Sequence, residues 1–251
     1  MTRRVPSRRV LAAAAAVTLL TLASGTTQAE SWLIDLGNDS SFRGASTPSP
    51  DSNGNHWTSV WSGAFYQDIP NSDGVSTAVD FGFTTPGGTD SYNGPAGPTD
   101  GGQPPANSVY DVSALGDLGV DEAVYDFYTN STFQIQNLSV GGSYNLSFFG
   151  SHKYNGNNTT RYTVYTDATF STPIASADLL VGVDDMHNQD MVATISGVSP
   201  AADGILYVGF GGAGGGEGYL NALQLTAVPE PTSLAALACL VAPAWSRRRA
   251  R

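Results

Sequence analysis

Four aromatic residues occur within ten positions of one another, after a long polar segment: Trp57, Trp61, Phe65 and Tyr66. Exposed aromatic rings stack on the apolar faces of sugars, while nearby Asp and Asn side chains bond the hydroxyl groups. We therefore predict carbohydrate-binding positions at Trp57, Trp61 and Tyr66, joined by Tyr154 from a loop rich in Gly and Asn. A place in the hydrophobic core stays open as the alternative for Trp57 and Trp61.

A second candidate site is the segment 51–55, which reads DSNGN and carries oxygen-bearing side chains at alternating positions. Carboxylate and amide oxygens are the ligands that hard cations prefer, so Asp51, Asn53 and Asn55 are predicted calcium ligands. The segment lacks the Gly and the terminal Glu that an EF-hand has at fixed places. An Asx-rich turn that binds no metal is therefore the alternative.

The glycine run from Gly209 to Gly214 matches the GxGxxG pattern of dinucleotide-binding proteins. That chemistry needs a helix N-terminus next, and here more glycines and another strand-like segment follow. We predict a flexible glycine loop and no nucleotide. The sequence also offers no matched acid–base pair, which favours binding or a structural role over catalysis. A polysaccharide hydrolase or lyase, and a structural surface protein without a ligand, stay open as alternatives.

Charge is distributed unevenly along the 251 residues, whose formal net charge is −11. Eight arginines lie near the two ends, whereas residues 30–228 hold three basic residues against 21 acidic ones, a net charge of −18. Such a surface repels phosphate backbones and anionic lipids, so nucleic acid is excluded as a partner. The one cysteine, Cys239, lies near the C-terminus, so no disulfide supports the middle region, and a structural calcium ion is expected to relieve its carboxylate repulsion.

The first 29 residues are predicted to be a secretory signal peptide. Four arginines come first, an apolar run from Val10 to Leu22 follows, and small residues lead to a cleavage position after Ala29. Ser7-Arg8-Arg9-Val10-Leu11 also approaches a twin-arginine signal, so export by the general or by the twin-arginine route stays open.

Residues 228–251 are predicted to be a second targeting segment, at the C-terminus. Pro229-Glu230-Pro231 precedes an uncharged stretch over 234–245 and a basic cluster with Arg247, Arg248 and Arg249. The stretch is shorter than the ~20 residues that span a bilayer, which suggests a transient membrane hold by a C-terminal helix. The three parts together resemble the bacterial PEP-CTERM sorting signal. The resemblance implies processing by the membrane protease exosortase and release or attachment at the cell envelope; an ordinary tail anchor is the alternative.

The middle region, 30–227, is predicted to be one all-β domain, because apolar and polar residues alternate with period two. The segments 131–138 and 143–149 show the alternation most clearly and are predicted to pair as a hairpin. Only 109–123 has a helical pattern, which its glycines weaken. Further strands are expected at 32–36, 75–84, around 162–164, 205–210 and 219–227. Many antiparallel strands around one core predict a β-sandwich or jelly roll.

Several motifs of this region resemble the galactose-binding-like jelly-roll domains of exported planctomycete-type proteins that carry PEP-CTERM tails. They are Leu33-Ile34-Asp35-Leu36-Gly37, Asp73-Gly74, Leu138 to Leu146 and Tyr219 to Leu225. Leu36 replaces the usual phenylalanine. The resemblance implies a non-catalytic, exported surface or matrix protein that binds polysaccharide, with a structural calcium ion in some relatives. Exopolysaccharide and exosortase are the expected partners.

Overall fold

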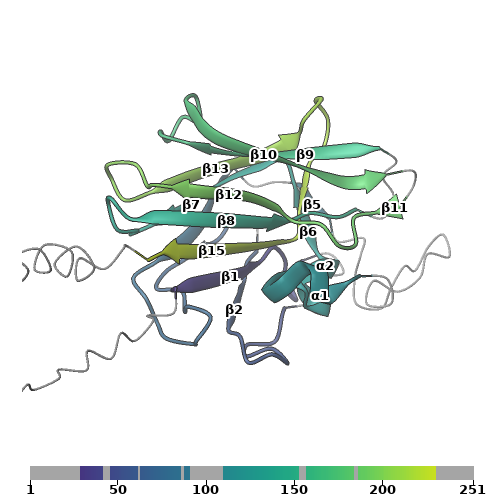
Figure 1. The fold of residues 1–251 in the computed structure, drawn as a ribbon, viewed down its shortest axis with the longest axis horizontal. Helices are drawn as coiled ribbons and strands as arrows, with labels where there is room; N and C mark the ends of the chain where they lie inside the picture. The colour runs from purple at the N-terminus through teal and green to yellow at the C-terminus, as the bar shows by residue number, and fades with distance from the viewer. Residues whose placement is uncertain are drawn as a thin grey trace, which may run out of the picture.

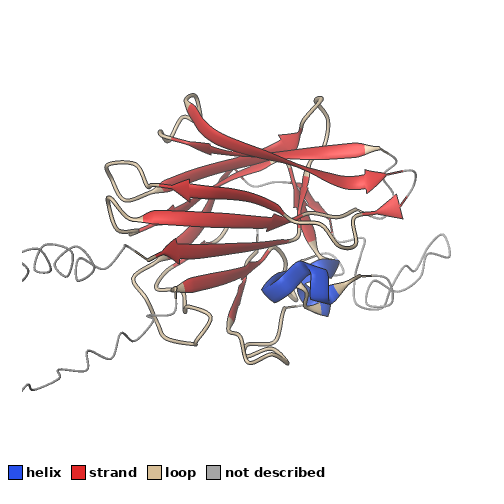
Figure 2. Ribbon diagram, in the orientation of Figure 1, coloured by secondary structure: helices blue, strands red, loops and turns tan. Residues whose placement is uncertain are grey.

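A computed structural model gives the structure of the protein, and it describes residues 29–41, 46–61, 63–85, 88–90, 110–152, 157–183 and 186–229. The described chain is built mainly from β-strands, which pack as two large sheets (Figures 1 and 2). Its helices are short and lie together at one side of the strands (Figure 2). The prediction of an all-β domain made mostly of antiparallel strands is therefore confirmed.

The first large sheet has five strands, and its first and last strands in the sequence are neighbours. Ser31 pairs with Thr226 and Asp35 pairs with Ala222 in an antiparallel ladder. The pair β1–β2 is parallel, whereas the others in this sheet are antiparallel. In spatial order the strands are β12 (Ala193–Val198), β8 (Ser143–Phe149), β15 (Ala222–Val228), β1 (Ser31–Asp35) and β2 (Trp57–Ser59).

The second large sheet has seven strands, and all of its pairs are antiparallel. In spatial order they are β11 (Met186–His187), β10 (Pro173–Val183), β9 (Asn158–Tyr165), β13 (Leu206–Gly212), β7 (Ser131–Gln136), β4 (Asp80–Thr85) and β3 (Phe65–Tyr66). A small third sheet joins β14 (Tyr219–Leu220), β6 (Phe127–Thr129) and β5 (Gly88–Asp90).

The main hydrophobic core lies between the two large sheets. Period-two alternation explains it, because every second residue of each strand points inward: Phe133 and Ile135 from β7, and Leu146 and Phe148 from β8, are fully buried in one cluster. The rings of Phe148 and Tyr162 stack at 4.4 Å between centroids and so join the two sheets directly.

Three short helices cover the outer face of the five-stranded sheet: α1 (Val112–Leu115), the 3-10 helix η2 (Gly116–Leu118) and α2 (Asp121–Tyr125). Their apolar side chains, among them Leu115 and Leu118, form a second buried cluster with Trp57 and Phe149. Asp111 caps α1, because its Oδ1 accepts hydrogen bonds from two backbone N–H groups. The seven-stranded sheet has no such cover from the described helices.

The predicted hairpin of 131–138 with 143–149 is wrong. These segments form β7 and β8, but β7 pairs with β4 and β13, whereas β8 pairs with β12 and β15. The chain crosses from one sheet to the other at the turn around Gly141 and Gly142. The crossing lets the apolar faces of both strands meet inside the sandwich, whereas hairpin pairing would place them side by side in one sheet.

Several predicted segments lie outside the described residues. They include residues 1–28 of the signal peptide, Glu230 and Pro231 of the sorting motif, the 234–245 stretch, and Arg247, Arg248 and Arg249. No helix in the described part of the chain combines the length and the apolar character that a membrane crossing requires. The signal peptide, the sorting signal and the boundaries at 29 and 228 remain predictions.

Candidate functional site

Trp57 takes the core position that the sequence left open. It lies on β2 with 4 % of its surface exposed and packs under the short helices. Its indole Nε1–H donates to Asp51 Oδ2 at 2.9 Å. A ring enclosed in this way has no free face on which a sugar could stack.

Trp61 follows β2 in the sequence and Tyr66 lies on β3, and the two side chains differ in exposure. Trp61 is 48 % exposed, so its ring is open to solvent. Tyr66 is half-buried against the main core, and its hydroxyl oxygen accepts a hydrogen bond from the backbone N–H of Trp61 at 2.8 Å. Tyr154 lies outside the described residues. Of the four predicted sugar-binding residues, Trp61 alone is described and has an exposed ring.

Asp51 is the centre of the loop that the sequence marks as a calcium site. Its Oδ1 accepts hydrogen bonds from the backbone N–H groups of Asn53 and Asn55, at 2.8 and 2.9 Å. Its other oxygen, Oδ2, accepts the bond from Trp57. A carboxylate can accept about four hydrogen bonds, and three N–H donors already point at this one. The loop thus has the hydrogen bonds of the Asx-rich turn, which favours that alternative, and calcium binding by Asp51, Asn53 and Asn55 stays a prediction.

The same loop lines an acidic hollow of about 400 Å³, together with Asp121 and Glu122 at the start of α2. Within the described ranges, no three His, Cys, Asp or Glu side chains come close enough together to hold a metal ion. A structural calcium ion elsewhere in the protein stays a prediction.

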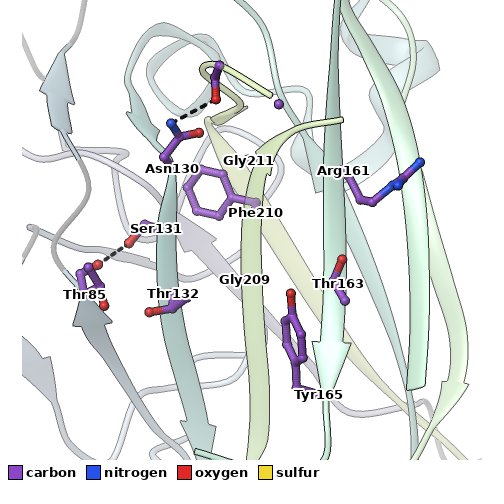
Figure 3. Close-up of a pocket in the computed structure, with 12 residues that line it drawn as sticks. Thr85, Asn130, Ser131, Thr132, Arg161, Thr163, Tyr165, Gly209, Phe210 and Gly211 are labelled. Atoms are coloured by element: carbon purple, nitrogen blue, oxygen red, sulfur yellow. Dashed lines mark hydrogen bonds between the residues drawn. The ribbon is translucent and has the colours of Figure 1, made fainter. Parts of the chain in front are cut away.

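A trough of about 420 Å³ on the outer face of the seven-stranded sheet has the features of a binding site (Figure 3). Its floor is β13, where Gly209 and Gly211 face outward because Val208 and Phe210 point into the core. Because these two positions have no side chains, the surface over β13 is lower than the surface over β7 and β9 on its two sides. The trough therefore runs over a strip of bare backbone.

The walls of the trough carry hydroxyl groups and one aromatic ring. Thr132 stands on β7, and Thr163 and Tyr165 stand on β9 (Figure 3). The Tyr165 ring leans toward the floor, since a Cβ added to Gly209 would lie 3.3 Å from both Tyr165 Cε2 and Thr132 Cγ2. At one end, Asn130 closes the trough by donating from Nδ2 to Gly216 O at 3.1 Å. Such a surface offers hydrogen bonds and one apolar face in the same groove.

Arg161 and Asp178 form an ion pair at the edge of the trough, between β9 and β10. Arg161 Nε donates to Asp178 Oδ1 and Nη2 donates to Oδ2, both at 2.7 Å. The hydrogen bond and the opposite charge raise the pKa of Arg161 and lower that of Asp178, so both groups stay ionised. Arg161 is the one charged residue lining the described trough, and its partner neutralises it. The trough is therefore electrically neutral in a strongly acidic protein.

Aromatic side chains continue beyond the trough on the same face. Tyr207 pairs with Tyr165 across β13 and β9, and Phe170 makes edge contacts with both rings, at 6.0 and 5.6 Å between centroids. The Tyr207 hydroxyl donates to Asp203 Oδ2 at 2.6 Å. Burial, then this bond, raises the pKa of Tyr207 to about 12, so the phenol stays neutral.

The glycines of the trough are evident in the sequence, but the structure predicted for them is wrong. The segment from Gly209 was predicted to be a flexible loop, whereas Gly209 to Gly212 belong to β13 and the turn begins only at Ala213. The period-two alternation of 205–210 was the signal that could have found the floor. Continued by one step, it places Gly209 and Gly211 on the same outward face.

Comparison with known protein families, with curated proteins and with solved structures finds no match to this chain.

Proposed function

We propose that this protein is an exported bacterial cell-surface or extracellular-matrix protein whose β domain binds polysaccharide without catalysis. The observation that carries the proposal is the glycine-floored trough on the outer face of the seven-stranded sheet. Export rests on the predicted signal peptide, and processing by exosortase rests on the resemblance of residues 228–251 to PEP-CTERM signals. A galactose-binding-like jelly roll is the finer fold that we propose for the domain.

The chemistry of the trough supports carbohydrate as the ligand. A sugar presents hydroxyl groups around its edge and apolar C–H groups on its faces. The hydroxyl groups of Thr132 and Thr163 suit the sugar hydroxyls, the glycine floor leaves room for the ring, and the Tyr165 ring suits a C–H face. Polar side chains that fix orientation beside an aromatic surface are the usual composition of small-ligand sites.

Binding is favoured over catalysis by the ionisable groups that line the trough. They are Arg161, held by Asp178, and the phenol of Tyr165. Hydrolysis of a glycosidic bond ordinarily uses two carboxyl groups that flank the bond. No carboxyl group is among the residues lining this trough.

The binding proposal predicts that Gly209→Val abolishes polysaccharide binding. The valine side chain would occupy the floor between Thr132 and Tyr165, where even a Cβ is tightly placed. Valine suits a β-strand, so the domain should still fold. Affinity electrophoresis of the full chain through gels containing xylan, β-1,3-glucan, galactomannan or polygalacturonate measures the binding as retardation.

Gly214→Val is the matched control for this test. Gly214 lies in the turn after β13, and no heavy atom lies within 4 Å of an added Cβ. The control should be retarded like the unchanged protein, while circular dichroism verifies that both variants keep their β structure. Equal retardation of Gly209→Val and the unchanged protein would remove the trough from consideration, and no retardation in any gel would refute polysaccharide binding.

The export proposal predicts that mature protein isolated from its host lacks Arg247 to Arg251. The Pro229-Glu230-Pro231 triplet, the short apolar stretch and the arginine cluster resemble a signal that exosortase cleaves close to the triplet. Intact-mass spectrometry measures the outcome directly. A full C-terminus in mature material would exclude the sorting-signal interpretation and leave an ordinary tail anchor.

A further inference from the structure

Phe65 is an exposed ring on the same sheet face as the trough. It lies on the edge strand β3, opposite Gly82, and is 50 % exposed. Phe81 and Phe83 point into the core, so Gly82 faces outward between them. A Cβ on Gly82 would lie 2.3 Å from Phe65 Cδ2, which means that the ring rests directly on the glycine. Glycine at position 82 thus makes room for an aromatic platform on the outer face.

The strand register places Phe65 and Tyr165 at the two ends of one row across the sheet. From β3 to β9 the row runs through Phe65, Gly82, Gln134, Tyr207 and Tyr165. The backbones at its two ends are four strand spacings apart, or about 19 Å at ~4.8 Å per strand. The rings lie closer than this, because Phe65 lies over Gly82 of β4 and Tyr165 leans toward Gly209 of β13, two spacings or about 10 Å apart. That separation is still longer than one sugar ring, so the two rings can contact one ligand only if the ligand is a chain.

The residues between the two rings can bond sugar hydroxyls. Gln134 stands in the middle of the row, and its Oε1 accepts a hydrogen bond from Gln136 Nε2 at 2.8 Å. Beside them, Thr84 and Thr132 join β4 to β7 through their hydroxyl groups at 2.7 Å. The row therefore has an aromatic surface at each end, which Tyr207 and Phe170 extend beside Tyr165, and a neutral amide with neighbouring hydroxyls in its middle.

Charge limits which kind of chain can lie there. Arg161 beside the row is neutralised by its ion pair with Asp178, and residues 30–228 carry a net charge of −18. At low salt, such a protein repels a polymer of acidic sugars. A neutral polymer does not meet that repulsion.

We propose that the ligand is a neutral polysaccharide chain that crosses the strands of the seven-stranded sheet, with one end of the bound segment on Tyr165 and the other on Phe65. This inference rests on the proposed function and adds to it the length, direction and charge class of the ligand. Phe65 is then a binding residue outside the trough itself.

The test measures how affinity depends on chain length. The full chain is titrated calorimetrically with the disaccharide through the hexasaccharide of each neutral polymer used above, and with oligogalacturonides of the same lengths. The hexasaccharide of the recognised polymer should bind about tenfold tighter than the disaccharide, because only the longer chain reaches both rings. Oligogalacturonides should bind more weakly at low salt.

Substitutions test whether Phe65 causes the tighter binding of longer chains. Phe65→Leu keeps an apolar cover on Gly82 but removes the aromatic face, and it should remove most of the gain of the hexasaccharide. Tyr165→Ala should weaken binding at every length. Val140→Ala, at a 63 % exposed apolar position in the turn after β7, should change nothing.

The outcomes separate this inference from the proposed function. Binding of a neutral sugar with no length dependence, or with full length dependence in Phe65→Leu, overturns the inference and leaves carbohydrate binding in place. Preferred binding of oligogalacturonides overturns the neutral class. Self-association in sedimentation that Phe65→Leu abolishes, with sugar binding unchanged, assigns the ring to a contact between copies instead. No binding by any sugar refutes the function and the inference together.

Discussion

Between pH 4 and pH 8, the Asp35→Asn variant should gain about 4 kcal/mol in free energy of unfolding relative to the unchanged protein. Asp35 is fully buried at the end of β1. Its Oδ2 accepts hydrogen bonds from Thr47 N and Thr47 Oγ1, at 3.0 and 2.9 Å, whereas Oδ1 has no hydrogen-bond partner among the described residues. Burial raises the pKa of Asp35 from 3.8 to about 7; the nearby hydroxyl of Ser59 and the hydrogen bonds from Thr47 oppose the rise, and the charge of Glu122 adds to it.

The direction of the pH dependence follows from proton binding. Between pH 4 and pH 7 the folded protein keeps the Asp35 proton, which the unfolded chain releases. Its contribution to stability is therefore complete below about pH 4, and it declines as the pH rises to about 7. Asparagine keeps an oxygen acceptor for Thr47 and never ionises, so it escapes this decline.

Urea unfolding of the full chain and the variant from pH 4 to pH 8 measures the effect as the difference between two curves. The pKa values of Asp111, Asp167 and Asp178 are lowered by their hydrogen bonds, so these groups change the curves mainly below this range. Asp80→Asn is the matched control, because Asp80 is also buried but both its oxygens accept hydrogen bonds, from Asp68 N and Asn137 Nδ2. Parallel curves for Asp35→Asn and the unchanged protein would contradict the assignment.

Asp51→Ala should cost about 3 kcal/mol of stability, and the loss should be the same with calcium or with chelator. The substitution leaves the buried indole N–H of Trp57 without its partner, which costs about 1–3 kcal/mol. It also removes the two bonds that fold the loop back on itself at Asn53 and Asn55. Thermal and urea unfolding of the full chain in EDTA, in calcium and in sodium chloride of matched ionic strength measures both parts of the prediction.

A calcium ligand at Asp51 would behave differently. The substitution would then also remove the stability that calcium adds by binding the folded state, so the loss would be larger in calcium than in EDTA or sodium chloride. Asp51→Asn gives a second test, because an amide oxygen can keep a bond to one donor. It should lie between alanine and the unchanged protein under all three conditions.

The class of fold could be predicted from the sequence because alternation is a local property. Phe133 and Ile135 alternate with polar residues, and this pattern predicts the inward face of β7 whichever strands lie beside it. The neighbours themselves could not be predicted in the same way. The turn around Gly141 fits both a hairpin and a crossing between sheets, and only the packing of the whole core decides between them.

The candidate site was harder to predict for a related reason. Sequence reasoning looked for side chains, and it chose Trp57, whose ring is in the core, and Tyr66, which points inward where its neighbour Phe65 points outward. The floor of the trough consists of side chains that are missing, at Gly209 and Gly211. A glycine is informative only when the strand register shows what stands on both sides of it.

The pairing of β1 with β15 decides when this protein can finish folding. Among the described strands, β15 is the last in the sequence, yet it lies between β1 and β8 in the middle of its sheet. Until it arrives, β1 and β8 lack the strand that joins them, and Leu146 and Ile34 lack the inward-facing Leu223 and Leu225 of their shared core. Contacts between such distant parts of a chain form late and slowly. The five-stranded sheet therefore closes only after β15 has been made, and until then the unpaired edges of β1 and β8 are open to aggregation.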